Sequence, residues 1–543
     1  MPTLNWIGKE AVVNHHLQVP FHLLKDVPEL ACGNPGEGNL IVQGDNLVAL
    51  KALLPYYAGQ VKCICIDPPY NTGEQTWTYN DKVSSPLIAD WLGRTVGKEA
   101  DDLSRHDKWL CMMYPRLQLL LKFLSRDGFI FICIDDVELY RLKMVMDELL
   151  PPDRFVGAFV WKSRRNLDSR HNVNVSVDHE YVLAYRGPDA RLRGAAKDYD
   201  KYSNPDGDPR GDWMSDNLVG LATKDRRPNL HYDLIDPVTG LNYGCPNKGY
   251  RYSKETMAQK IAEGRVIWPK SPTGRPRHKK FRADLESEFT GFSSIIDCGN
   301  TNEGTEEVAE IMGTPQFIFP KPRTLIQALV EQATDKGSLV LDSFSGSGTT
   351  GHAVLAQNRK DGGNRRFILV EMEPNIAHDI TAERVRRVAE GYANAKGEHV
   401  DGLGGGFRYC ELGEPLFDEH GKIRDSVRFA DLARHVYFTE TGEPYPLPNL
   451  PPQAGEGTNE KSYIRSSALL GECRGVGIYL LYNGILGDKS ANGGYVLTRA
   501  VLAQLPPFDG PKVIYCAGCL LGRDRLRAEN IIVRQTPYEI KVS

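Results

Sequence analysis

The first third of the chain alternates between short continuous apolar runs and stretches whose apolar residues recur at helical spacing. Continuous apolar runs are typical of strands buried on both faces of a sheet, whereas a spacing of three or four residues is typical of helices. The alternation therefore predicts a sheet with helices packed on its faces. The predicted strands are 40–43, 61–66 and 128–134, and the predicted helices follow Asn46 and cover 109–124 and 140–150.

The same alternation returns near residue 322, where it predicts strands at 338–342 and 366–371 and helices at 322–334, 351–358 and 380–389. Before it, charged residues, glycines and prolines interrupt every short apolar run. We therefore expect one α/β sheet in two halves, 1–160 and 316–400, separated by an inserted module at 161–315. The remaining residues, 401–543, contain strand-like runs at 476–481 and 512–515 and are expected to form a small α+β C-terminal domain that contacts a partner or a second copy.

Composition and charge narrow the class of protein. Of 543 residues, 41% are hydrophobic and 25% are charged, which is ordinary for a globular enzyme. The net charge of −4 excludes a uniformly basic coat, so any contact with nucleic acid requires a local basic surface. No apolar window of about eighteen residues and no secretory signal is evident, so we expect a cytoplasmic protein without membrane contact.

The eleven cysteines are scattered, often inside apolar runs, which indicates reduced thiols in the core. One Cys-x-x-Cys pair, Cys516 and Cys519, has no second pair at zinc-ribbon spacing. Structural zinc needs four ligands, so no metal site is expected.

A glycine loop follows the predicted strand at 338–342. Gly346 and Gly348 form a tight turn before a helix, which brings backbone N–H groups and a helix amino terminus against a ligand. By itself such a loop also fits a structural strand-to-helix turn. No lysine follows the second glycine, so the phosphate-binding pattern of ATP-binding loops is absent. The next strand ends at Glu371, whose carboxylate can accept hydrogen bonds from ribose hydroxyls, and Glu373 competes for that role.

The tetrapeptide Asp-Pro-Pro-Tyr at 67–70 is more specific, and it ends the predicted strand at 61–66. An exocyclic amine of a base is a poor nucleophile, because its lone pair is delocalised into the ring. The Asp67 carboxylate and the Pro68 carbonyl can accept both of its N–H bonds and point the lone pair at a methyl donor. Pro69 adds rigidity and no competing N–H, and Tyr70 offers a face on which an extruded base stacks. The alternative is a strand-terminating turn with an exposed tyrosine.

These motifs and their order resemble the β class of amino-methyltransferases, in which the catalytic motif precedes the cofactor loop. Among them, the chain is similar to the modification (Mod) subunits of Type III restriction-modification systems over about residues 1 to 410. The motifs that carry the resemblance are 44–47, 66–73 with Trp77 and Tyr79, 179–183, 208–211, 319–322 and 344–348. The resemblance implies a Rossmann-like methyltransferase sheet, S-adenosylmethionine as cofactor and methylation of adenine N6 in double-stranded DNA.

The resemblance also assigns residues. Asp67, Pro68, Pro69 and Tyr70 orient the amine and stack the base, and Lys321 lies beside the methionine moiety of the cofactor. Asp45 corresponds to an acidic position near the cofactor's adenine, although it equally fits the N-cap of the following helix. The residues expected at the cofactor site are Asp45, Lys321, Asp342, Phe344, Gly346, Gly348, Thr349 and Glu371.

The module at 161–315 corresponds to the target-recognition region of the family. Its basic clusters suit contact with DNA phosphates, although a solvated loop is the favoured explanation for any single arginine. The expected DNA-binding residues are Lys162, Arg164, Arg165 and Arg170 in the first cluster and Arg275, Arg277, Lys279 and Lys280 in the second. A restriction subunit with helicase and nuclease activity is the implied protein partner, and a homodimer is the other.

Two alternatives to adenine methylation remain at this stage. Methylation of cytosine N4 needs the same amine chemistry, but serine is more usual than aspartate before Pro-Pro-Tyr in that group, so Asp67 favours adenine. A DNA-recognition subunit that guides a partner without methylating would not need Asp67 and Tyr70. RNA and protein methyltransferases are disfavoured by the motif order and the long insert.

Overall fold

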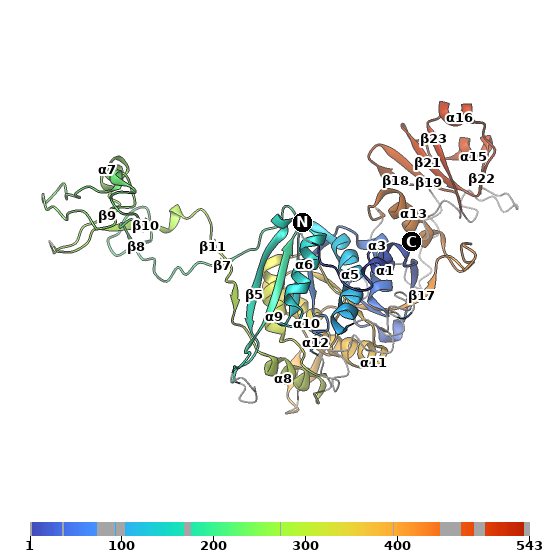
Figure 1. The fold of residues 1–543 in the computed structure, drawn as a ribbon, viewed down its shortest axis with the longest axis horizontal. Helices are drawn as coiled ribbons and strands as arrows, with labels where there is room; N and C mark the ends of the chain where they lie inside the picture. Colours follow the sequence, from blue (N-terminus) through green and yellow to red (C-terminus); the bar gives the residue numbers. More distant parts are fainter. Residues whose placement is uncertain are drawn as a thin grey trace. The chain divides into compact units, whose positions relative to one another are not determined.

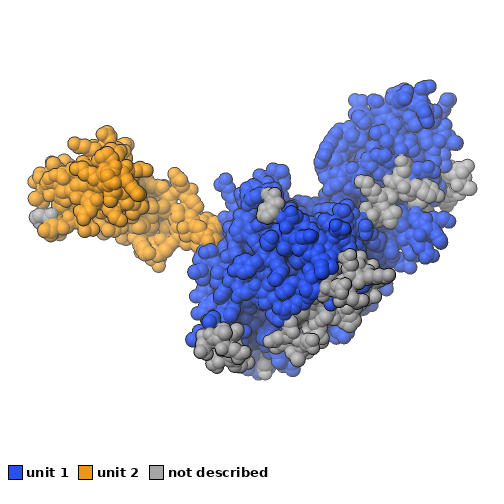
Figure 2. Space-filling model, in the orientation of Figure 1, with its two compact units in different colours: residues 1–192, 293–543 blue, residues 193–292 orange. Residues whose placement is uncertain are grey.

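The computed structural model describes residues 3–34, 37–72, 93, 104–167, 175–271, 273–315, 317–394, 396–445, 468–482 and 495–536. The chain forms two compact units (Figure 2). Unit 1 contains residues 1–192 and 293–543, and unit 2 contains residues 193–292.

Unit 1 is built on a ten-stranded mixed sheet (Figure 1). Six neighbouring strands in its centre run parallel, which confirms the expected α/β sheet. Their order is β17 (Arg408–Pro415), β2 (Leu40–Gln43), β14 (Arg366–Glu371), β13 (Leu339–Asp342), β3 (Val61–Ile66) and β4 (Leu124–Ile134). Beyond β4, β6 (His179–Arg186) runs antiparallel between β4 and β5 (Phe155–Lys162), and the edges are β1 (His22–Asp26) and β12 (Ile295–Ile296).

The direction of strand succession reverses between β3 and β13. From β3 the chain continues to β4 on one side, and from β13 it continues to β14 on the other side. In open parallel sheets, such a switch point opens a crevice at the carboxyl ends of the strands. It brings Asp67, which follows β3, next to the glycine loop after β13, although 277 residues separate Asp67 from Phe344.

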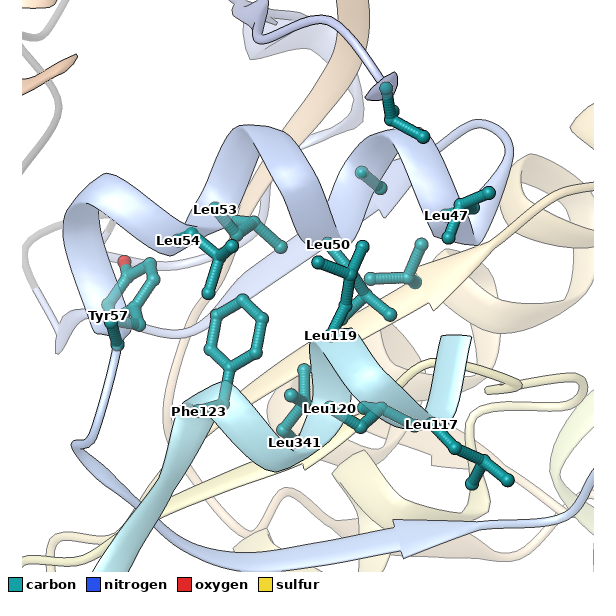
Figure 3. Packing of buried hydrophobic residues seen from close by; sticks show 14 of the residues in the cluster. Leu47, Leu50, Leu53, Leu54, Tyr57, Leu117, Leu119, Leu120, Phe123 and Leu341 are labelled. Carbon is teal, nitrogen blue, oxygen red and sulfur yellow. The ribbon is translucent and has the colours of Figure 1, made fainter. Parts of the chain in front are cut away.

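Helices cover both faces of this sheet. Helices α3 (Asn46–Tyr57) and α5 (Arg105–Phe123) pack on each other and on Leu341, with Leu50 and Leu54 facing Leu119 and Phe123 (Figure 3). These side chains are at most 1% exposed, and burying each one contributes about 1.5–3 kcal/mol. On the opposite face, α10 (Thr349–Asp361) lies against Phe367 and Leu369 of β14. Further helices of this core include α6 (Leu139–Leu149), α8 (Thr301–Met312), α9 (Arg323–Ala333), α12 (Glu383–Glu390) and α13 (Phe429–Thr441).

Unit 2 has a small core of its own, which includes Leu218, Tyr250 and Met257. Its sheet consists of β8 (Trp213–Asn217), β10 (Arg277–Phe281) and β9 (Val266–Ile267), with helix α7 (Lys254–Ala262). Where the chain enters and leaves the unit, β7 (Ala195–Ala196) pairs with β11 (Phe289–Thr290). Adjacent entry and exit strands are typical of an inserted domain.

Unit 2, at residues 193–292, is shorter than the insert expected from the sequence at 161–315. Strand β6 falls inside that range but pairs with β4, and α8 likewise belongs to unit 1. The boundary expected at 160 therefore lies within the sheet, since β5 ends at Lys162. Similarly, β17 lies after residue 400 yet pairs with β2. Strand pairing between residues far apart in the sequence makes β6 and β17 part of this sheet, and such pairing leaves no local pattern in the sequence.

The C-terminal part of unit 1 is a four-stranded sheet that contains the strands expected at 476–481 and 512–515. Its strands are β18 (Leu469–Cys473), β19 (Val476–Leu480), β21 (Lys512–Cys516) and β23 (Ile531–Gln535). It is joined to α13 by hydrogen bonds from Tyr437 to the Glu472 carbonyl (3.0 Å) and from Tyr515 to Glu440 (2.6 Å). All eleven cysteines are unbridged, as expected. Within the described ranges, no helix is long and apolar enough to cross a membrane.

Candidate active site

Asp67 lies at the carboxyl end of β3, where the chain leaves the sheet. Its Oδ2 is 3.0 Å from the ammonium of Lys321. Its Oδ1 is buried and has no hydrogen-bond partner among the residues that the structure describes. Burial raises the pKa of Asp67, and the Lys321 ammonium opposes that shift. One oxygen is thus engaged by a cation, and the other is an unused acceptor.

The turn that follows Asp67 is fixed by buried anchors. The Pro69 carbonyl accepts a hydrogen bond from the indole of Trp109 (2.6 Å). Asn71 has a left-handed backbone with φ of 60°, and its amide donates to Glu138 (2.5 Å). Glu138 is fully buried and also contacts His106 of α5. Because each anchor comes from a packed helix or the turn before it, the Pro68 carbonyl and Tyr70 are held in place.

Tyr70 and Lys321 meet at a third side chain, Glu180 of β6. The Tyr70 hydroxyl donates to Glu180 Oε2 (2.9 Å), and the Lys321 Nζ lies 3.3 Å from the same oxygen. The Lys321 Nζ is also 4.7 Å from the centroid of the Tyr70 ring, which is within cation–π range. We call Asp67, Lys321 and Glu180 the ion cluster. Sequence reasoning missed the part of Glu180, for which the only signal was its place in the motif at 179–183.

The glycine loop joins β13 to α10 at the same edge of the sheet. Gly346 and Gly348 have φ of 48° and 76°, a backbone region that glycine adopts without strain. The Gly346 N–H donates to Glu371 Oε2 (2.9 Å), and the Glu373 N–H donates to Glu371 Oε1 (3.0 Å). Glu371 is 1% exposed, so this carboxylate fastens the loop to the end of β14.

Asp342 closes β13 directly before the loop. It accepts hydrogen bonds from the Phe344 N–H (3.0 Å) and the Thr350 hydroxyl (2.6 Å). Burial raises the pKa of Asp342 to about 7, and the nearby Asp67 carboxylate adds to the increase. Asp342 therefore braces the loop and can change its charge near neutral pH.

A pocket lies between the end of β3 and the glycine loop. Phe317, Pro320, Ile326 and Phe344 form its apolar wall. The buried Ser345 hydroxyl also lines it and has no partner within the described part of the chain. An apolar wall with a few unsatisfied polar groups is typical of a small-molecule site. The expected residues that line the pocket are Asp67, Lys321, Asp342, Phe344, Gly346 and Thr349.

Asp45 and several other predicted residues do not line the pocket itself. Asp45 caps α3 by accepting from the N–H groups of Leu47 (2.9 Å) and Val48 (3.2 Å), which is the alternative that the sequence left open. Its other oxygen pairs with the buried Arg116 at 2.9 Å. The residues predicted at the site but not among those lining the pocket are Pro68, Pro69 and Tyr70 of the turn, Gly348, Glu371 and Asp45.

The basic residues predicted to contact DNA are in different environments. Lys162, Arg164 and Arg165 are exposed at and after the end of β5 in unit 1. In unit 2, Arg275 and Arg277 are exposed, and Lys280 is partly exposed. The prediction for Arg170, and the motif residues Trp77 and Tyr79, fall outside the described residues.

Lys279 corrects the prediction for the second basic cluster. Its side chain is only 7% exposed, and it pairs with Asp206 (2.6 Å) and Asp208 (2.5 Å). Its ammonium also lies 4.8 Å from the ring centroid of Trp213. An ammonium that two carboxylates already neutralise is not available to DNA phosphates. On a strand, adjacent side chains point to opposite faces, so Lys280 does not share this environment.

Comparisons with known proteins show which family the chain belongs to. The N6/N4 DNA methylase family matches residues 61–383. The Type III StyLTI Mod subunit of Salmonella typhimurium is 34% identical over 382 residues, or 66% of this chain and 58% of that protein. The EcoP15I Mod subunit of Escherichia coli is 29% identical over 72% of this chain and 69% of that protein. The Type II methyltransferase M.KpnI of Klebsiella pneumoniae is 29% identical over 66% of this chain and 89% of that protein.

The match to the StyLTI subunit thus spans less than two thirds of that relative's length. The family match, in contrast, covers more than half of this chain and contains both β3 and β13, whose ends form the pocket. The chain therefore belongs to the DNA methylase family.

Proposed function

We propose that the protein transfers a methyl group from S-adenosylmethionine to N6 of an adenine that has left the DNA duplex. The unpartnered Oδ1 of Asp67 carries this proposal, since it is a buried acceptor that lines the pocket. A base amine that donates one N–H to Oδ1 and the other to the Pro68 carbonyl presents its lone pair to the methyl donor. After transfer, the amine carries an extra proton, and Oδ1 is placed to accept it.

The pocket supports S-adenosylmethionine as the cofactor. The cofactor supplies an activated methyl group on a cationic sulfonium, and Asp67 and Asp342 outnumber Lys321 among the charged residues that line the pocket. Negative potential favours a cationic ligand. The apolar wall suits the adenine ring, and the Ser345 hydroxyl is free to bind a polar atom. Glu371 and Glu373 remain the candidates for the ribose, because a carboxylate oxygen can accept more than one hydrogen bond.

We further propose that unit 2 recognises DNA. It contains 18 lysines and arginines and 14 aspartates and glutamates, so its net charge is +4 and that of the remaining chain is −8. A basic unit in an acidic protein suits phosphate contact. Double-stranded DNA is therefore the proposed substrate, with Lys162, Arg164 and Arg165 as further contacts from unit 1.

The similarity to Type III Mod subunits supports a restriction subunit as the protein partner, and the C-terminal sheet is the proposed contact. A homodimer is the second assembly that we propose to test, by light scattering with and without DNA. We propose the cytoplasm as the location of the reaction, because the proposed substrates are DNA and S-adenosylmethionine.

A transfer assay tests the proposed function. Purified protein with labelled S-adenosylmethionine is expected to methylate unmethylated duplex DNA. Asp67→Ala is expected to lower the transfer rate by at least about 100-fold, because the acceptor that orients the amine is lost. DNA affinity in a gel-shift assay is expected to change little. Retained activity in this variant would contradict the mechanism.

Methylation of cytosine N4 is the alternative, since the same acceptors suit that amine. Single-molecule sequencing of DNA from cells that express the protein reports the modified base, the sequence around it and the strand. N6-methyladenine is expected, and N4-methylcytosine would overturn the choice of base. Loss of all modification, with DNA binding intact, would instead favour a recognition subunit.

A further inference from the structure

The ion cluster places one buried lysine between two carboxylates. Lys321 is 7% exposed, and its Nζ is 3.0 Å from Asp67 Oδ2 and 3.3 Å from Glu180 Oε2. Its backbone carbonyl accepts a hydrogen bond from the Thr349 hydroxyl (3.2 Å) at the start of α10. Lys321 therefore connects the glycine loop with Asp67 after the end of β3 and with Glu180 at the start of β6.

We propose that Lys321 and Glu180 are positioning residues for Asp67, rather than ligands of the cofactor. The inference rests on the proposed function and deepens it. Lys321 holds Oδ2, which leaves Oδ1 as the oxygen that receives the target amine. Glu180 holds the Lys321 ammonium and the Tyr70 hydroxyl together, so one carboxylate aligns the amine acceptor and the stacking ring. The Lys321 ammonium also lies over the Tyr70 ring, so the same cation contacts both the amine acceptor and the stacking ring.

The charges of the cluster suit the reaction. Methyl transfer moves positive charge from the donor sulfur to the target amine, so a site with one surplus negative charge stabilises the transition state. Without a cation between them, two partly buried carboxylates repel each other, and that repulsion disfavours a site with both negative charges. Burial alone would lower the pKa of Lys321, but Asp67 and Glu180 raise it, so Lys321 stays a cation between the two carboxylates.

Among the residues that the structure describes, few other titratable groups face Asp67. Tyr70 and Cys133 of β4 stay neutral near pH 7, because burial raises the pKa of Tyr70 and of Cys133 well above their usual values. Asp342 of β13 is the remaining group, with its pKa raised to about 7 by burial. The acid side of the pH–rate profile therefore reports Asp67 and Asp342, and Asp342→Asn separates the two.

The test compares Lys321→Met with Glu180→Gln. Removing the cation raises the pKa of Asp67, so Lys321→Met is expected to move the acid limb of the profile up by at least about one pH unit and to lower kcat at least about tenfold. Glu180 raises the pKa of Asp67, so removing its charge lowers that pKa. Glu180→Gln is therefore expected to move the acid limb to lower pH. In calorimetry, both variants are expected to bind S-adenosylmethionine within about threefold of the unchanged protein.

A second readout does not require turnover. Without Lys321, folded Asp67 resists ionisation, so the loss of thermal stability in Lys321→Met is expected to grow as pH rises from 5 to 8. The double variant with Glu180→Gln is expected to reduce that loss, which shows that charge rather than packing is responsible. Lys321→Arg keeps the positive charge, and it replaces Lys321→Met in these tests if Lys321→Met does not fold.

Two results would overturn the inference. One is a loss of cofactor affinity above about tenfold in Lys321→Met with an unmoved acid limb, which would make Lys321 a cofactor ligand. The other is a shift of the limb in the same direction, or no shift, in both variants. If the unchanged protein does not methylate DNA, the proposed function fails, and the pH dependence of unfolding still tests the link between Lys321, Glu180 and Asp67.

Discussion

Asp342 is a buried carboxylate whose protonation changes near neutral pH. Burial raises its pKa to about 7 in the folded chain, well above that of an exposed aspartate. The protein without ligands is therefore expected to lose stability as pH rises through this range, because the unfolded carboxyl ionises first. Asp342→Asn is expected to remove up to about 4 kcal/mol of this dependence between pH 4 and 8. Urea unfolding at several pH values measures it.

Asp335 is the matched control for this residue. It lies in the turn before the same strand, and its side chain is 83% exposed. Asp335→Asn is expected to change the stability of the protein little at any of these pH values, because the side chain is at the surface. An equal effect of the two variants would mean that burial of Asp342 is not the cause.

At the level of elements, the two ends of α10 make different demands on glycine. Gly348 precedes the helix with φ of 76°, and a Cβ there would lie 3.1 Å from the Thr381 carbonyl. Gly362 follows the helix with φ of 65°, and a Cβ there meets no atom within 4 Å. Gly362→Ala is expected to cost about 1 kcal/mol from the left-handed backbone alone. Gly348→Ala is expected to cost more and to raise the Kd for S-adenosylmethionine at least about tenfold, because the loop lines the pocket.

Thermal unfolding and calorimetry on both variants separate the two contributions. Gly362→Ala is expected to bind the cofactor normally, since its end of α10 is remote from the glycine loop in sequence and lines no part of the pocket. Equal loss of cofactor affinity in the two variants would contradict a local role of Gly348.

At the level of the whole molecule, unit 2 places two adjacent lysines in different environments. Lys280 is partly exposed, so Lys280→Ala is expected to weaken DNA binding several-fold and to lower the salt slope of log K by about 1. Lys279 pairs with Asp206 and Asp208, so Lys279→Ala leaves two carboxylates without their cation. It is expected to lower the stability of unit 2. Binding titrations at several salt concentrations and hydrogen exchange of residues 193–292 measure the two effects.

The two lysines also serve as controls for each other. Lys280→Ala is expected to leave hydrogen exchange in unit 2 unchanged. If Lys279→Ala lowers the salt slope as much as Lys280→Ala while the unit stays protected, Lys279 contacts phosphate and its assignment as a structural residue is wrong.

Local patterns in the sequence determined the strands and the two motifs at their ends. Strands β3 and β13 are buried on both faces and therefore read as continuous apolar runs, which prolines and glycines end abruptly. The chemistry of Asp67 and the ligand-binding character of the glycine loop follow from residue types within a few positions. The location of an insert between the two halves follows from the loss of periodicity.

Only the tertiary structure decided which distant residues meet. Pairing of β3 with β13 brings Asp67 to the glycine loop. Pairing of β6 with β4 brings Glu180 to Lys321, and it makes β6 part of the main sheet rather than of the insert. Lys279 looked like its basic neighbours until Asp206 and Asp208 were placed beside it. Periodicity reports which face a residue takes within its own element, whereas ion pairs and strand pairings join residues whose separation in sequence leaves no local trace.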